Sequence, residues 1–298
     1  MGHVEKLSGV FPPVATPFES ERIAVGTMAE NIRKYDETDI KGYLILGSNG
    51  EFRSLNDAEA LKIVDTVVRC KNPKKVLIVG AARESTFTTL EFIDRLADIG
   101  ADYVAILPPH YFVKKMTDAV LIRHYSMIAD RSKIPITIYN APKFSAGLLI
   151  SPYVISQLAE HPNIVGLKDT SKEDIAKYIQ AVPQTAEFAV LAGTINKFYD
   201  GLEKGAVGGV LSLAGYLPQK CCELQQAFLA GDREKARRMD TFLRTLSNEA
   251  AGKFGVAGLK AAMDLLGYYG GAPRLPLNRI STQNKQHLKA VLQKAGVL

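Results

Sequence analysis

Short apolar runs alternate with amphipathic stretches about every thirty residues along the chain. The runs are rich in β-branched and aromatic residues and predict strands, whereas the amphipathic stretches have the period of helices. We expect eight strands, at residues 9–16, 42–47, 76–80, 103–107, 135–139, 164–168, 188–192 and 208–213. Helices are expected after them, at residues 28–38, 55–69, 88–99, 119–131, 153–160, 172–180, 197–204 and 219–229.

Eight consecutive βα units predict an α/β fold, the (β/α)8 TIM barrel, whose active site lies at the C-terminal ends of the strands. A doubly wound open sheet is the alternative, but residues 11–18 (FPPVATPF) lack the glycine-rich phosphate turn that it requires. Further along the chain only helices are expected, at residues 232–251, 255–266 and 282–295. We therefore divide the chain into a barrel, residues 1–230, and a C-terminal helical region packed on it, residues 231–298.

Composition excludes several classes of protein. The chain has 298 residues, 47% of them hydrophobic, with no apolar run of membrane-spanning length and no signal-peptide pattern, so we expect a cytoplasmic protein. Its net charge of +6 is spread out, which argues against nucleic acid binding and favours small anionic substrates. The three cysteines suggest no disulfide framework, and the five histidines show no zinc-binding spacing. We expect neither a metal nor a cofactor.

The strand at residues 164–168 (IVGLK) ends on a lysine where its apolar pattern calls for a buried residue. Burying an ammonium group is costly, so an inward-pointing Lys168 would lose its proton and become a nucleophile. A lysine that passes the strand end to reach solvent is the alternative. Tyr139, at the end of the preceding strand, is expected beside Lys168, either as a proton shuttle or as a core tyrosine with a satisfied hydroxyl.

Other strand ends supply further candidates. The turn at residues 47–51 (GSNGE) presents Ser48, Asn49 and backbone N–H groups that suit a carboxylate, although an Asn-Gly turn also occurs without a ligand. The aromatic loop at residues 108–112 (PPHYF) predicts a binding edge or a subunit contact. Further candidate substrate contacts at strand ends are Thr170, Gly193 and Leu211.

Together these motifs resemble the dihydrodipicolinate synthase and N-acetylneuraminate lyase family of class I pyruvate aldolases, over nearly the whole chain. The family's G-x-x-G-E turn matches residues 47–51, its Y-N-x-P motif residues 139–142, and its Schiff-base lysine strand residues 166–169. The resemblance implies a catalytic lysine at Lys168 that forms the imine and a catalytic tyrosine at Tyr139 that transfers protons.

The resemblance also implies substrate binding and assembly. Ser48 and Asn49 would hold the carboxylate of a keto acid. Tyr111 matches the family tyrosine that reaches into the site of a neighbouring subunit, which implies a homotetramer built as a dimer of dimers.

Within the family, the chain is most similar to 4-hydroxy-2-oxoglutarate aldolase of the mammalian mitochondrial type, with shared features at residues 161–166, 205–210 and 254–271. Dihydrodipicolinate synthases usually carry an arginine two residues after the proline of the tyrosine motif, where this chain has Phe144. The chain also departs from the pattern of this aldolase, since the loop at residues 139–147 is expected to be one residue longer and Pro108 stands where the family commonly has threonine.

The leading hypothesis is therefore a Schiff-base aldolase that cleaves 4-hydroxy-2-oxoglutarate to pyruvate and glyoxylate. The alternatives are a 2-keto-3-deoxy sugar acid aldolase, a dihydrodipicolinate synthase, and a non-catalytic barrel that binds keto acids. A metal-dependent aldolase would lose its activity in a chelator, and we expect no such loss.

Overall fold

The computed structural model describes all residues, 1–298, which form two compact units. Unit 1 consists of Met1–Gly9 and Val76–Val210, and unit 2 consists of Val10–Lys75 and Leu211–Leu298. No helix in the structure combines the length and the apolar character needed to cross a bilayer.

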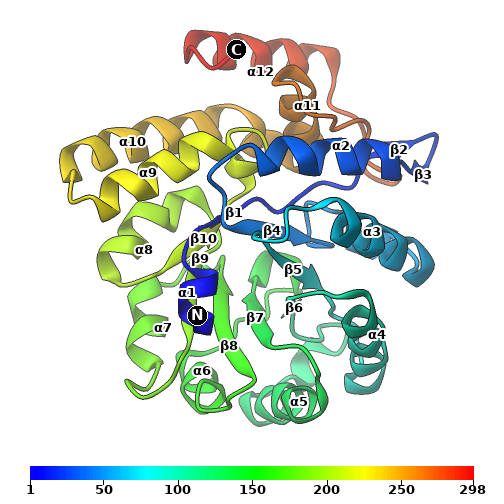
Figure 1. Ribbon diagram of the computed structural model, residues 1–298, viewed down its shortest axis with the longest axis vertical. Coiled ribbons are helices and arrows are strands. Elements are labelled where there is room, and N and C mark those ends of the chain that lie inside the picture. The colour runs from blue at the N-terminus through cyan, green and yellow to red at the C-terminus, as the bar shows by residue number, and fades with distance from the viewer. The chain divides into compact units, whose positions relative to one another are not determined.

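Six parallel strands form the sheet of unit 1, and their order in the sheet is their order along the chain (Figure 1). Every residue of the five strands β6, β7, β8, β9 and β10 is buried, as expected for strands that are covered on both faces. The strands are β5 (Val76–Gly80), β6 (Tyr103–Ile106), β7 (Ile136–Asn140), β8 (Ile164–Asp169), β9 (Ala189–Ala192) and β10 (Gly208–Val210).

The helices of unit 1 are α1 (His3–Leu7), α4 (Thr86–Ile99), α5 (Asp118–Arg131), α6 (Pro152–Leu158), α7 (Ile175–Ala181) and α8 (Phe198–Lys204). Short 3₁₀ helices follow three of the strands, as η2 (Val113–Lys115), η3 (Pro142–Phe144) and η4 (Ile195–Lys197). Four α-helices begin where a side-chain oxygen accepts a hydrogen bond from a backbone N–H of the first turn. These N-cap residues are Ser85, Thr117, Ser151 and Asp174.

In unit 2, strand β1 (Val10–Phe11) lies beside β4 (Gly42–Ile45), and β2 (Phe18–Glu19) pairs with β3 (Arg22–Ile23) in an antiparallel hairpin. Its α-helices are α2 (Val25–Asp36), α3 (Asp57–Cys70), α9 (Pro218–Leu229), α10 (Arg233–Glu249), α11 (Gly255–Leu265) and α12 (Thr282–Lys294). Its 3₁₀ helices are η1 (Phe52–Ser54), η5 (Ser212–Gly215) and η6 (Ala251–Phe254). Helix α9 packs against α10, and α11 against α12 (Figure 1).

The predicted fold class is confirmed. Strands β1 and β4 to β10 are the eight parallel strands of a TIM barrel, each followed by a helix, and the chain ends in a helical region. The division at residue 230 stays a prediction.

The predicted bounds are wrong for the first and the last strand of the barrel. The strand expected at residues 9–16 is limited to Val10–Phe11, because Pro12 and Pro13 have no N–H to donate to a ladder. The strand expected at residues 208–213 ends at Val210, since the chain turns there into η5. The hairpin β2–β3 was not expected.

Candidate functional site

Strands β7 and β8 bring the two candidate catalytic residues of unit 1 together. Tyr139 and Lys168 are partners in the register of this strand pair, and Asn140 and Asp169 are the next partners. Successive side chains of a strand point to opposite faces, so Tyr139 and Lys168 share one face and Asn140 and Asp169 share the other. The register therefore separates an inner pair, Tyr139 and Lys168, from an outer pair, Asn140 and Asp169.

Lys168 is buried and only 5% exposed. Its Nζ lies 4.0 Å from the centroid of the Tyr139 ring. Burial lowers the pKa of Lys168 from its ordinary value of 10.5 to about 7, and no carboxylate counteracts this shift. A lysine with such a pKa is half neutral near pH 7, so a large fraction of the molecules carries a nucleophilic amine.

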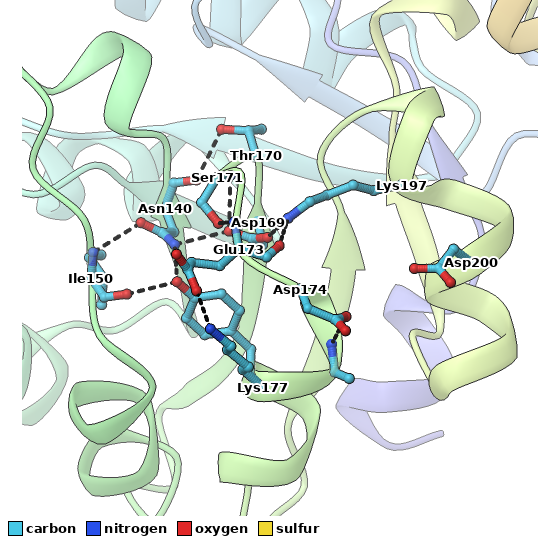
Figure 2. A network of polar contacts seen from close by, with 12 residues as sticks. Asn140, Ile150, Asp169, Thr170, Ser171, Glu173, Asp174, Lys177, Lys197 and Asp200 are labelled. Atoms are coloured by element: carbon cyan, nitrogen blue, oxygen red, sulfur yellow. Dashed lines mark hydrogen bonds and ion pairs between the residues drawn. The ribbon is translucent and has the colours of Figure 1, made fainter.

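The outer pair belongs to a buried polar network (Figure 2). Asn140 Nδ2 donates hydrogen bonds to Asp169 Oδ1 at 2.9 Å and to the Tyr178 hydroxyl at 2.9 Å. Asp169 Oδ2 forms an ion pair with Lys197 Nζ. Sequence reasoning missed this network. Asn140 and Asp169 each adjoin a candidate catalytic residue and were a usable signal, but no local pattern indicated Lys197.

Two candidate substrate contacts lie at the ends of β8 and β9. The Thr170 hydroxyl donates a hydrogen bond to the Asn140 carbonyl at 3.0 Å, and the Gly193 N–H donates to the Asp169 carbonyl at 2.7 Å. A Cβ on Gly193 would lie 2.2 Å from the Thr170 methyl group and 2.6 Å from the Asp169 carbonyl oxygen. The two strand ends are thus in close contact, and position 193 has room only for glycine.

Tyr111 lies apart from these strand ends, on the loop after β6. Its side chain is 78% exposed and packs edge to face on Phe112, which is 69% exposed. The backbone N–H of Tyr111 donates to Glu84 Oε2 at 3.0 Å, which fixes this part of the loop. The contact of Tyr111 with a neighbouring subunit stays a prediction.

In unit 2, the turn after β4 carries Ser48 and Asn49. Ser48 Oγ is buried and has no hydrogen-bond partner, and Asn49 Nδ2 donates to Ser212 Oγ at 2.9 Å. Leu211 is fully buried and precedes η5, with its N–H donating to the Phe11 carbonyl at 3.1 Å. The buried Ser48 hydroxyl thus has an unused hydrogen-bonding capacity.

A buried ion pair anchors the end of the same turn. Glu51, at φ 54°, ends the turn, and its Oε1 lies 2.5 Å from Lys260 Nζ of α11, with both side chains fully buried. Glu51 Oε2 accepts a hydrogen bond from the Arg274 N–H at 2.8 Å. Lys260 Nζ also lies 4.5 Å from the centroid of the Phe18 ring. This support was likewise not expected, because its members are far apart in sequence.

The structure contains no group of three or more His, Cys, Asp or Glu side chains placed to hold a metal ion. The arrangement in unit 1 instead combines a buried amine with an adjacent phenol, a combination suited to imine formation and proton transfer.

Comparison with known proteins bears on this chemistry. The profile of the dihydrodipicolinate synthetase family matches residues 6–295. An uncharacterised DapA-like lyase of Halobacterium salinarum is 33% identical over 294 residues, which cover 98% of this chain and 95% of that protein. A 4-hydroxy-tetrahydrodipicolinate synthase of Exiguobacterium sp. is 32% identical over 288 residues, which cover 96% of this chain and 97% of that protein.

Solved structures agree with the family match. Dihydrodipicolinate synthase from Thermotoga maritima superposes with a TM-score of 0.92 at 27% identity, covering 98% of this chain and 99% of that one. YagE, a prophage protein of the dihydrodipicolinic acid synthase family from E. coli K12 in complex with pyruvate, superposes with a TM-score of 0.91 at 25% identity, with the same coverage. The chain therefore belongs to the dihydrodipicolinate synthetase family, whose members are lyases that use Schiff-base pyruvate aldolase chemistry.

Proposed function

We propose that Lys168 is the Schiff-base lysine of this enzyme and that the substrate is a 4-hydroxy-2-oxo acid, cleaved to pyruvate and an aldehyde. The observation that carries the proposal is the buried Lys168 amine, whose pKa falls to about 7, beside the Tyr139 ring. A lysine that only stabilised the fold would be paired with a carboxylate, as Lys260 is with Glu51.

The reaction begins when the neutral Lys168 amine attacks the C2 carbonyl of the substrate and water leaves. The resulting protonated imine is the electron sink for the next step. Removal of the proton from the C4 hydroxyl breaks the C3–C4 bond, releases the aldehyde and leaves an enamine on Lys168. Protonation of the enamine at C3 and hydrolysis of the imine then release pyruvate.

Tyr139 is the residue we assign to proton transfer. It shares one face of the β7–β8 pair with Lys168, so its phenol can serve both carbinolamine breakdown and deprotonation of the C4 hydroxyl. We assign the keto-acid carboxylate to Ser48 and Asn49, and the unpartnered Ser48 hydroxyl supports this assignment. Gly193, Thr170 and Leu211 remain proposed substrate contacts, and Tyr111 remains a proposed catalytic contribution from a second subunit of a homotetramer.

The preferred substrate is 4-hydroxy-2-oxoglutarate, which yields pyruvate and glyoxylate. The resemblance at residues 161–166, 205–210 and 254–271 favours it. A 2-keto-3-deoxy sugar acid yields the same pyruvate half and differs only at its distal end.

A second candidate is 4-hydroxy-tetrahydrodipicolinate synthesis, which the name of the Exiguobacterium relative favours. Phe144 argues against this candidate, because the synthases usually have an arginine at this position, two residues after the proline that corresponds to Pro142. Both candidates use the same lysine, so the identity of the second reactant separates them.

Two experiments test the proposal. Pyruvate and borohydride should add one reduced pyruvyl group to the peptide that contains Lys168, and Lys168→Ala should abolish the adduct. A panel of 4-hydroxy-2-oxo and 2-keto-3-deoxy acids should then release pyruvate, with 4-hydroxy-2-oxoglutarate fastest. An adduct on another residue would refute the mechanism. Formation of 4-hydroxy-tetrahydrodipicolinate without pyruvate release from the panel would select the second candidate.

A further inference from the structure

The outer pair, Asn140 and Asp169, includes a carboxylate that has no role in the proposed reaction. Asp169 follows Lys168 directly and is fully buried. Its Oδ1 accepts hydrogen bonds from Asn140 Nδ2 at 2.9 Å and from the Ser171 N–H at 3.1 Å. A carboxylate charge in so buried a position requires a counter-charge.

Lys197, the last residue of η4, supplies that counter-charge. Figure 2 shows its side chain reaching toward Asp169, with which it forms the ion pair, and its Nζ also donates to the Glu173 carbonyl at 2.6 Å. The Lys197 side chain is only 17% exposed. A buried pair of this kind is strongly coupled, because loss of one partner leaves the other charge without compensation.

Asn140 fixes the other side of the network. Its Oδ1 accepts a hydrogen bond from the Ile150 N–H at 3.1 Å, and the Tyr178 hydroxyl, to which Asn140 donates, itself donates to the Ile150 carbonyl at 3.0 Å. The ends of β7 and β8 are thereby tied to residue 150 and to α7. These contacts also fix the backbone positions of the inner pair, because Tyr139 and Lys168 directly precede Asn140 and Asp169.

Few titratable groups face Asp169 in unit 1. They are Tyr178 from α7 and, as Figure 2 shows, Lys197 from η4 and Glu173 from the loop between β8 and α7. The Glu173 carboxylate is itself paired with Lys177 at 2.5 Å, and β9 contributes only the apolar residues 189–192. Lys197 is therefore the cation on which the charge balance of Asp169 depends.

We propose that Lys197 is a positioning residue of the aldolase reaction, which neutralises Asp169 and holds the end of β8 so that Lys168 remains the one uncompensated amine at the strand end. This proposal rests on the function proposed above, in which Lys168 forms the imine. Lys197 acts through Asp169 and is not assigned any contact with the substrate.

The electrostatic consequence has a definite sign. An Asp169 carboxylate without its cation would favour the protonated form of Lys168 and so raise the pKa of that amine. At the separation of neighbouring residues on opposite faces of a strand, the shift is on the order of one pH unit. A Lys197 cation without its carboxylate would act in the opposite direction.

The experiment measures how the rate of pyruvyl adduct formation at Lys168, trapped with borohydride, depends on pH. In Lys197→Met the acid-side midpoint should rise by about one pH unit, whereas in Asp169→Asn it should fall. Lys197→Arg should keep the wild-type midpoint, and Asp169→Asn combined with Lys197→Met should restore it, because neither charge remains. Lys204→Met is the matched control, since Lys204 pairs with Asp174 and Asp200 on the surface and should leave the midpoint unchanged.

A purely structural role for Lys197 would lower the rate equally at every pH. An unshifted midpoint in both Lys197→Met and Asp169→Asn would overturn the proposal, as would a double variant that keeps the shift of Lys197→Met. If Lys197→Met does not fold, the comparison of Asp169→Asn with the double variant tests the proposal. The proposal then requires a lower midpoint in Asp169→Asn than in the double variant. Absence of an adduct at Lys168 in the wild-type enzyme would instead refute the proposed function, so the two failures are distinguishable.

Discussion

Lys168 Nζ lies over the ring of Tyr139, 4.0 Å from its centroid, because the two residues are partners in the register of the β7–β8 pair. The ring covers one side of the amine, and burial lowers the pKa of Lys168 to about 7. The same neighbour thus contributes an apolar face to the lysine and a hydroxyl to the proposed proton transfer.

Reaction with pyruvate should depend steeply on pH. The pKa of Lys168 is lowered to about 7, so the neutral amine, and with it the rate of adduct formation, should rise about tenfold per pH unit below that value and level off above it. Single-turnover trapping with borohydride between pH 5 and 10 measures this dependence. A midpoint near 10 would mean that Lys168 is solvated like an ordinary surface lysine.

Replacing Lys168 by methionine should stabilise the fold while abolishing activity. The unfolded chain binds a proton at this position up to about pH 10.5, whereas the folded chain releases it near pH 7. The stability cost of the lysine is therefore full below pH 7, on the order of 5 kcal/mol, and fades as the pH rises toward 10.5. Thermal unfolding at several pH values measures it. The advantage of Lys168→Met should shrink with rising pH, and a variant less stable than wild type at pH 6 would contradict the prediction.

Tyr139→Phe should lower kcat by about 10²- to 10⁴-fold, the usual contribution of a positioned acid or base. The ring remains over Lys168, so burial of the amine and the pH midpoint of adduct formation should stay close to those of wild type. Steady-state kinetics with the preferred oxo acid, together with the trapping assay, separate the two effects. A loss of less than threefold would remove Tyr139 from the proton-transfer role.

Removing one partner of the buried ion pair between Glu51 and Lys260 should strongly destabilise the fold of unit 2. Lys260→Met leaves the Glu51 carboxylate buried without a cation and should destabilise the protein by about 3–5 kcal/mol. Glu51→Gln combined with Lys260→Met should recover much of this loss. Urea unfolding is the measurement, and Arg238→Met is the control, because the exposed pair of Arg238 with Glu234 should contribute little. Equal stability of Lys260→Met and wild type would contradict the prediction.

The hydrophobic pattern predicted the strands well where local chemistry decides them. Residues 76–80 were expected as a strand and form β5 with the same bounds, since β-branched runs between turn residues leave few alternatives. The pattern was wrong where a proline interrupts the ladder, as at Pro12, or where the backbone turns early, as after Val210.

The supporting residues of the candidate site were harder to predict. Glu51 and Lys260 are 209 positions apart, and Lys197 is 28 positions from Asp169. The tertiary fold brings such pairs together. The local sequence around a lysine does not distinguish one that is solvated from one that pairs with a buried carboxylate. The outer pair, by contrast, follows from strand alternation once Tyr139 and Lys168 are placed on the inner face.

Gly193 limits how this enzyme can be re-engineered. Shortening Thr170 would remove the methyl group 2.2 Å from a new Cβ, but the Asp169 carbonyl oxygen, at 2.6 Å, belongs to the main chain and would remain. Mutant libraries at position 193 should therefore yield few active clones whatever accompanies them. Diversity aimed at new aldehyde partners is better directed to residues 143–146 of the loop after β7, which we expect to differ in length from the corresponding loop of its relatives.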